Sequence, residues 1–121
     1  MKLKCLEVRF SICKLSEPHV EDLMGKMVFL AKTDEEVSLV CPTERVPEWA
    51  MTREDGWRAL RIEGVLDFSL IGILAPIAKL FADAKIGIFV VSTYNTDYVF
   101  VREVQLAQAK EVLAGAGYTI A

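Results

Sequence analysis

The sequence predicts an α+β protein in which helices cover one face of antiparallel sheets. Two observations support this class. Short segments with alternating or continuous apolar residues recur along the chain, and two longer segments carry apolar residues at helical spacing. In the second half, the expected elements follow in the order strand, helix, strand, strand, helix, strand, at residues 57–66, 69–84, 86–92, 98–102, 103–116 and 118–120. This order is that of the ferredoxin-like βαββαβ fold.

The two expected helices are defined by apolar stripes spaced by three and four residues. The first stripe consists of Leu70, Ile73, Leu74, Ile77, Leu80, Phe81 and Ala84. The second consists of Val104, Leu106, Ala109, Val112, Leu113 and Ala116. Pro76 lacks a backbone N–H and is expected to bend or loosen the first helix. Gly115 and Gly117 suit the C-terminal cap of the second helix.

The first half of the chain predicts a shorter version of the same unit. Its expected elements are a strand, a short helix, a strand and a strand, at residues 3–15, 18–24, 26–32 and 37–41. Residues 48–56 are interpreted as a connector, and a boundary is expected near Gly56. We therefore expect an N-terminal unit over residues 1–56 and a C-terminal unit over residues 57–121.

The composition excludes several classes of protein. Apolar residues make up 53% of the 121 residues, which predicts a packed core rather than disorder. The formal net charge is −3, with both signs interspersed, and this argues against a nucleic-acid surface. No apolar run approaches the roughly 18 residues that span a bilayer. The N-terminal residues lack the features of an export signal, so we expect no membrane association and a cytoplasmic location.

The sequence predicts neither a metal, nor a cofactor, nor an enzymatic activity. Cys5, Cys13 and Cys41 contain no CxxC pair and are interpreted as reduced, structural thiols. Neither Cys13 nor Cys41 has an adjacent base that would activate a thiolate. His19, the single histidine, lies in a polar stretch beside a proline and is interpreted as exposed rather than catalytic.

The first candidate binding segment lies at residues 66–74, where a strand is expected to pass into a helix. The N-terminus of a helix exposes unpaired N–H groups and a partial positive charge, which favour a carboxylate. Gly72 has no side chain, so a ligand can approach closely. In the alternative interpretation, Asp67 and Ser69 only cap the helix.

The second candidate segment is the polar loop at residues 92–97, between two expected strands. Its hydroxyl and amide groups suit the orientation of a ligand, and the carboxylate of Asp97 suits an ammonium group. In the alternative interpretation it is an ordinary solvated turn. An anion-binding helix start and an acidic loop at one end of one sheet together predict a zwitterionic ligand.

Three runs of the sequence resemble an ACT domain: residues 64–75 (GVLDFSLIGILA), 81–89 (FADAKIGIF) and 92–99 (STYNTDYV). They are similar in particular to the subfamily of small bacterial tandem-ACT proteins related to the animal cytosolic arginine sensor. The first half adds two shorter matches, at residues 39–42 (LVCP) and 46–47 (VP). The resemblance implies a ferredoxin-like ACT unit preceded by a shorter ACT-like unit.

The resemblance also implies a function. ACT units pair side by side and bind amino acids at their interface, so it implies a homodimer, a free amino acid as ligand and a regulated enzyme or regulator as partner. The ligand-binding residues implied are Leu66, Asp67, Phe68, Ser69, Gly72, Ile73, Ser92, Thr93, Asn95, Thr96 and Asp97. The alternative is a ligand-free ACT module that serves assembly only.

Overall fold

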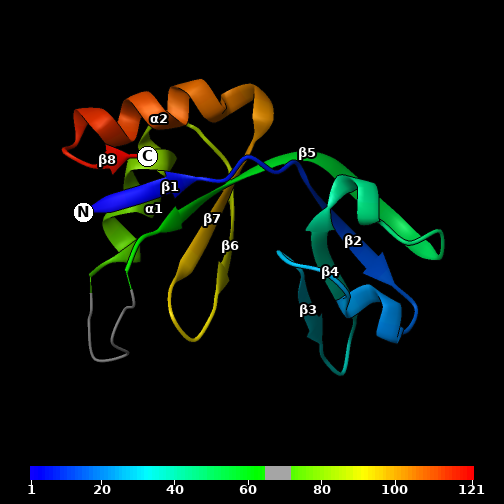
Figure 1. Cartoon of the computed structure of the whole chain (residues 1–121). Coiled ribbons are helices and arrows are strands. Elements are labelled where there is room, and N and C mark those ends of the chain that lie inside the picture. The colour runs from blue at the N-terminus through cyan, green and yellow to red at the C-terminus, as the bar shows by residue number, and fades with distance from the viewer. Residues whose placement is uncertain (65–71) are drawn as a thin grey trace. The chain divides into compact units, whose positions relative to one another are not determined.

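The computed structural model describes residues 1–64 and 72–121, which form two compact units (Figure 1). The larger unit comprises Met1–Glu7 and Arg58–Ala121, and the smaller unit comprises Val8–Trp57. The division at residue 57 lies beside the boundary expected at Gly56. Residues 1–7, however, belong with the larger unit, because the strand β1 (Lys2–Cys5) pairs with β5 (Ala50–Ile62) and with β8 (Thr119–Ile120).

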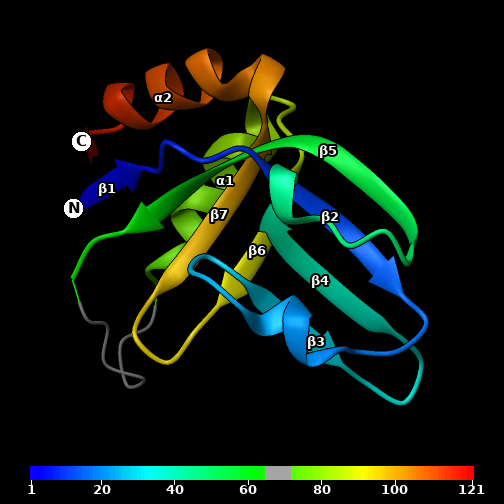
Figure 2. The same cartoon turned by 45° about the vertical axis from the view of Figure 1, so that its right-hand side comes forward.

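The larger unit has the strand order β6-β7-β5-β1-β8, with β6 at Ile88–Ser92 and β7 at Asp97–Arg102. β1 runs antiparallel to the end of β5 and parallel to β8. Two helices, α1 (Leu74–Asp83) and α2 (Leu106–Gly115), complete the expected order, and Figure 2 shows α1 behind β7. The unit is therefore the expected βαββαβ arrangement, with β1 added between its first and last strands.

The core of the larger unit joins both helices to one face of this sheet. Its buried residues are Leu3, Leu60, Ile62, Ile77, Phe81, Ile86, Val99, Val101, Ala109 and Leu113. The apolar stripe predicted for α1 is confirmed at Ile77 and Phe81. The stripe predicted for the second helix is wrong at its ends, because Val104 is 91% exposed and Ala116 is also exposed. Val104 lies in a separate 3-10 turn, η3 (Glu103–Gln105), whose tighter winding ends the α-helical spacing.

Helix α1 begins at Leu74, later than the sequence predicts. Gly72 precedes it with φ +74°, a left-handed conformation that cannot belong to the helix. Pro76 is the third residue of α1, where a backbone N–H has no partner within the helix. The bend expected from Pro76 therefore has no cause at this position. The rest of the expected start, residues 69–71, lies outside the described residues.

Both helices end in the same arrangement of backbone hydrogen bonds. At the end of α2, the N–H of Gly117 donates to Ala114 and that of Tyr118 donates to Leu113, as in a Schellman motif. At the end of α1, Lys85 and Ile86 donate in the same way to Ala82 and Phe81. Gly117 has φ +95° and confirms the predicted cap, whereas the corresponding residue after α1 is lysine, at φ +61°.

Lys85→Gly is expected to raise the free energy of unfolding by about 0.5–1 kcal/mol, because glycine adopts the left-handed conformation without steric cost. Urea denaturation followed by circular dichroism measures the change. Ala82→Gly, at an exposed right-handed position in α1, is the matched control and should lose about 1 kcal/mol. A loss of stability in both variants would show that Lys85 is not strained.

The smaller unit has the strand order β3-β4-β2-β5, in which β5 contributes its first part. Its other elements are β2 (Phe10–Leu15), β3 (Phe29–Lys32), β4 (Val37–Pro42), and the 3-10 turns η1 (Val20–Leu23) and η2 (Thr43–Arg45). The short helix expected over residues 18–24 is thus a single 3-10 turn. The order is again that of a ferredoxin-like sheet, with its helices reduced to turns.

Two predictions in the first half are wrong. The strand expected over residues 3–15 is interrupted at residues 6–9. Leu6 N–H still donates to Ala59 O of β5 at 3.0 Å, and the Arg9 carbonyl accepts from the backbone N–H of Thr43 at 2.9 Å as well as from a side chain. Arg58 Nη2 donates to Leu6 O at 2.9 Å, and Thr43 Oγ1 donates to Arg9 O at 3.2 Å. The connector expected over residues 48–56 is largely strand, because β5 begins at Ala50. Its polar residues pair with β2 while their side chains stay exposed.

Buried thiols form part of the small unit's core. Cys13 and Cys41 pack with Leu15, Val37 and Leu39, and both are free, as the sequence predicts. A hydrogen bond between the two thiols lowers the pKa of Cys13 and raises that of Cys41. Both thiols are buried in the core, in keeping with a structural role.

Candidate functional site

A pocket of about 330 Å³ lies in the larger unit, between the end of β5 and the hairpin that joins β6 to β7. Its described lining residues are Arg61, Ile62, Glu63, Gly64, Thr93, Asn95, Thr96 and Tyr98. The volume suits a small ligand, and the lining combines charged, hydroxyl and amide groups. Gly64, one of the lining residues, is the last described residue before residue 72.

The hairpin loop is fixed by hydrogen bonds within itself and to β5. The N–H of Thr93 donates to Thr96 O at 2.8 Å, and the Thr93 hydroxyl donates to the same oxygen at 3.0 Å. The Thr96 hydroxyl, in a side chain only 8% exposed, donates to Ile62 O at 2.6 Å. Thr96 therefore ties the loop to β5 and sets the distance between the two walls of the pocket.

Two oppositely charged side chains form an ion pair on the side of the pocket formed by the end of β5. Arg61 lies on β5 and Glu63 directly follows its last residue, where the Glu63 N–H still donates to Lys2 O at 2.9 Å, so the two side chains project to the same side. Arg61 Nε donates to Glu63 Oε2 at 3.2 Å, and these side chains are 23% and 30% exposed. The guanidinium also lies 5.9 Å from the centre of the Tyr98 ring. Hydrogen bonding to Tyr98, then to Glu63, raises the pKa of Arg61, so it stays charged.

The structure brings together some of the predicted site residues. Thr93, Asn95 and Thr96 line the pocket. Ser92 and Asp97 face each other as the terminal pair of β6 and β7, and they are not among the lining residues. The other predicted residues fall into two groups. Gly72 and Ile73 immediately precede α1 and are not lining residues either, whereas Leu66, Asp67, Phe68 and Ser69 lie outside the described residues.

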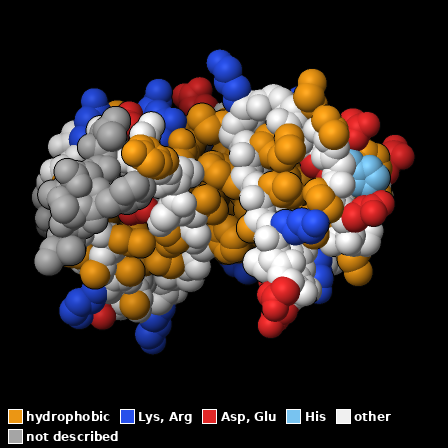
Figure 3. All heavy atoms as spheres, turned by 90° about the horizontal axis from the view of Figure 1, so that it is seen from below, with side chains coloured by type: hydrophobic (Ala, Val, Ile, Leu, Met, Phe, Trp, Pro, Cys, Tyr) orange, Lys and Arg blue, Asp and Glu red, His pale blue; other side chains and the backbone are white. Residues whose placement is uncertain are grey.

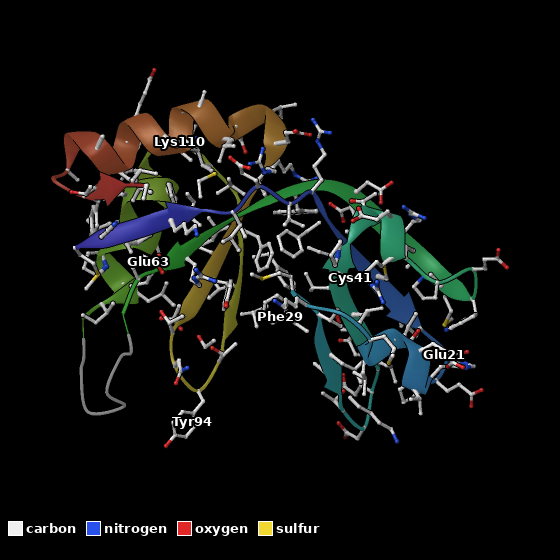
Figure 4. The ribbon with its side chains drawn as sticks, in the orientation of Figure 1. Glu21, Phe29, Cys41, Glu63, Tyr94 and Lys110 are labelled. Atoms are coloured by element: carbon white, nitrogen blue, oxygen red, sulfur yellow. The ribbon has the colours of Figure 1, made fainter. Side chains whose placement is uncertain are left out.

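Five of the lining residues were absent from the sequence prediction of the site: Arg61, Ile62, Glu63, Gly64 and Tyr98. The alternation of β5 assigns Arg61 and Glu63 to the outward face, away from the core. A charged pair on one strand face, just before the expected binding loop, was the available signal. Figure 4 shows Glu63 at the end of β5, whereas Tyr94, 79% exposed, points away from the tip of the hairpin.

The described surface carries charges of both signs, and its side chains form no cluster suited to a metal ion. On the face shown in Figure 3, basic and acidic side chains are interspersed. Across residues 1–64 and 72–121, no group of three His, Cys, Asp or Glu side chains is placed to hold a metal ion. Over the same residues, none of the helices has the length and apolar character needed to cross a membrane.

Several solved structures have a fold similar to that of this chain. Protein Atu0741 from Agrobacterium tumefaciens is 32% identical with a TM-score of 0.89, over 99% of this chain and 91% of that one. VC0802 from Vibrio cholerae, described as a possible transport protein, is 17% identical with a TM-score of 0.75, over 94% and 88% of the two chains. Aspartate kinase from Clostridium acetobutylicum is 12% identical with a TM-score of 0.61, over 90% of this chain and 33% of that one.

Comparison of the sequence identifies the family. No curated protein matches the chain. A family model described as an ACT domain matches residues 52–115, which include β5 from its third residue, α1, β6, β7 and α2. The matched segment contains every described residue that lines the pocket. On this match, which covers more than half of the sequence, the chain belongs to the ACT domain family.

Proposed function

We propose that this ACT protein is a non-catalytic regulatory module that binds a free amino acid in the pocket between β5 and the β6–β7 hairpin. One observation supports the proposal above all: a single pocket of about 330 Å³ is lined by two opposite charges together with hydroxyl and amide groups. An amino acid carries a carboxylate and an ammonium group, which such a lining can satisfy together. The solved aspartate kinase of similar fold is described as an allosteric enzyme, which is consistent with a regulatory role.

The proposal includes the way in which the ligand acts. The protein works in the cytoplasm as a homodimer, in the manner of the tandem-ACT proteins that its sequence resembles, with a regulated enzyme or regulator as its downstream partner. Asp67, Ser69 and Gly72, which the sequence predicts as ligand-binding residues, have a supporting role in the proposed site, and Ser92 and Asp97 support the hairpin loop. The proposal takes the chain as an N-terminal ACT-like unit and a C-terminal ACT domain, with the pocket described above in the C-terminal one.

Thermal shift with each of the standard amino acids tests this proposal. A ligand at about one hundred times its dissociation constant should add about 2.7 kcal/mol of stability, which is a clear rise in melting temperature. Asn95→Ala should abolish the rise, because it removes an exposed amide that lines the pocket, without lowering the stability of the free protein. Tyr94→Ala, at the neighbouring exposed position outside the lining, is the matched control and should keep the rise.

The alternative is an assembly module without a ligand. Val104 supports this alternative, because its apolar side chain is 91% exposed in η3, just before α2, where it suits a contact with another subunit. Under this alternative, none of the amino acids raises the melting temperature, and Val104→Asp lowers the oligomeric state measured by sedimentation.

A further inference from the structure

We propose that Arg61 and Glu63 are the residues that distinguish an amino acid from its singly charged analogues, with Arg61 binding the α-carboxylate and Glu63 the α-ammonium group. This inference rests on the amino-acid-binding function proposed above. It assigns the charge recognition to the strand β5 rather than to the helix start and Asp97, which the sequence indicates. It also states which analogues the pocket rejects.

The geometry places both charges where a ligand can reach them. Arg61 and Glu63 line the same pocket, and each side chain is partly exposed. Their mutual contact uses one guanidinium N–H and one carboxylate oxygen, at 3.2 Å. A guanidinium has five N–H donors and a carboxylate has two acceptor oxygens, so each group has further capacity for hydrogen bonds.

Tyr98 makes the arginine a positioned group rather than a freely moving side chain. Its ring lies 5.9 Å from the guanidinium carbon, and it projects from β7 into the same pocket. A guanidinium held against an aromatic ring keeps its planar array of donors in one orientation. Planar donors in a fixed orientation recognise a carboxylate by paired hydrogen bonds.

The pairing of the two charges explains why a zwitterion is favoured. A ligand with a carboxylate alone must compete with Glu63 for Arg61 and brings a second negative charge beside Glu63. A ligand with an ammonium group alone must compete with Arg61 for Glu63 and brings a second positive charge beside Arg61. A zwitterion gives each residue a new partner of opposite charge and leaves neither charge unpaired, so the exchange costs least with an amino acid.

Isothermal titration calorimetry tests the inference with three probes. They are the L-amino acid that stabilises the wild-type protein most, its α-hydroxy acid, which lacks the ammonium group, and its amine, which lacks the carboxylate. Wild type should bind the amino acid about tenfold or more tightly than either analogue. Glu63→Gln should weaken binding of the amino acid by about tenfold, and the affinity for the hydroxy acid should stay the same or rise. Arg61→Gln should weaken binding of both the amino acid and the hydroxy acid and leave the affinity for the amine unchanged.

The conservative variants and a distant charge control separate recognition from structure. Arg61→Lys and Glu63→Asp keep the charges and should retain part of the discrimination. Glu111→Gln changes the charge equally at an exposed position of α2 and should bind all three probes like wild type. If wild type binds no amino acid, the proposed function and this inference both fail. If it binds one, but Glu63→Gln and Arg61→Gln keep the wild-type ratios or weaken all three probes equally, this inference alone is overturned.

Discussion

Phe81→Ala is expected to lower the free energy of unfolding by about 3–5 kcal/mol, the largest single effect that the structure predicts. Phe81 is fully buried on α1, at 0% exposure, and belongs to the cluster that joins both helices to the sheet. Its removal leaves a cavity among side chains from α1, β5 and β7 that cannot close without moving the helix. Urea denaturation monitored by far-ultraviolet circular dichroism measures the loss.

Tyr94→Ala is the matched control for this prediction. It truncates an aromatic side chain of nearly the same size, 79% exposed at the tip of the β6–β7 hairpin, and should change stability by less than about 0.5 kcal/mol. Equal losses in the two variants would contradict the assignment of Phe81 to the core.

Thr96→Val is expected to lower the free energy of unfolding by about 1–3 kcal/mol and to weaken amino-acid binding. Valine preserves the shape of the side chain but removes the hydroxyl that donates to Ile62 O at 2.6 Å. The exchange takes away the bond that ties the hairpin loop to β5, so the two walls of the pocket lose their fixed spacing. Chemical denaturation and calorimetry with the most stabilising amino acid measure the two effects.

Thr96→Ser separates the hydroxyl from the methyl group. Serine keeps the donor and loses one methyl, so the loss of stability should be about 1 kcal/mol or less, with binding close to that of wild type. If serine and valine variants lose stability and affinity equally, the bond to Ile62 does not organise the pocket.

The sequence predicts the larger unit well because its signals are local. The helical spacing of Ile77 and Phe81, the apolar strand before the hairpin and the glycine at position 117 each depend on neighbours in the chain. The insertion of β1 between β5 and β8 could not be predicted in this way, because that pairing joins Leu3 to Ile62 and to Ile120 across most of the sequence.

The smaller unit shows why polar strands escape detection. Residues 50–56 begin β5 but carry mostly exposed side chains, so they lack the alternating apolar pattern that marks a half-buried strand. Their backbone pairs with β2 all the same, and the pairing partner rather than the composition decides their conformation. The short helix expected after Pro18 fails for a related reason, since four residues form only one 3-10 turn.

Some residues of the candidate site can be predicted from local sequence signals, and others cannot. The loop residues Thr93, Asn95 and Thr96 stand out in the sequence because a polar run follows a buried strand. Arg61 and Glu63 do not, because an alternating strand always has an outward face, and only the pairing of β5 with β7 shows that this face meets the hairpin loop. Charged residues on an outward strand face therefore need the neighbouring strand to reveal their role.

Amide chemical shifts of the uniformly ¹⁵N-labelled protein, titrated with each standard amino acid, test the central claim most directly. We expect one or more amino acids to shift the amides of residues 61–64 and 93–98 in a saturable manner, and to leave the unit Val8–Trp57 largely unchanged. Saturable shifts confined to Val8–Trp57, or no saturable shift with any amino acid, would contradict the claim that this pocket binds the ligand.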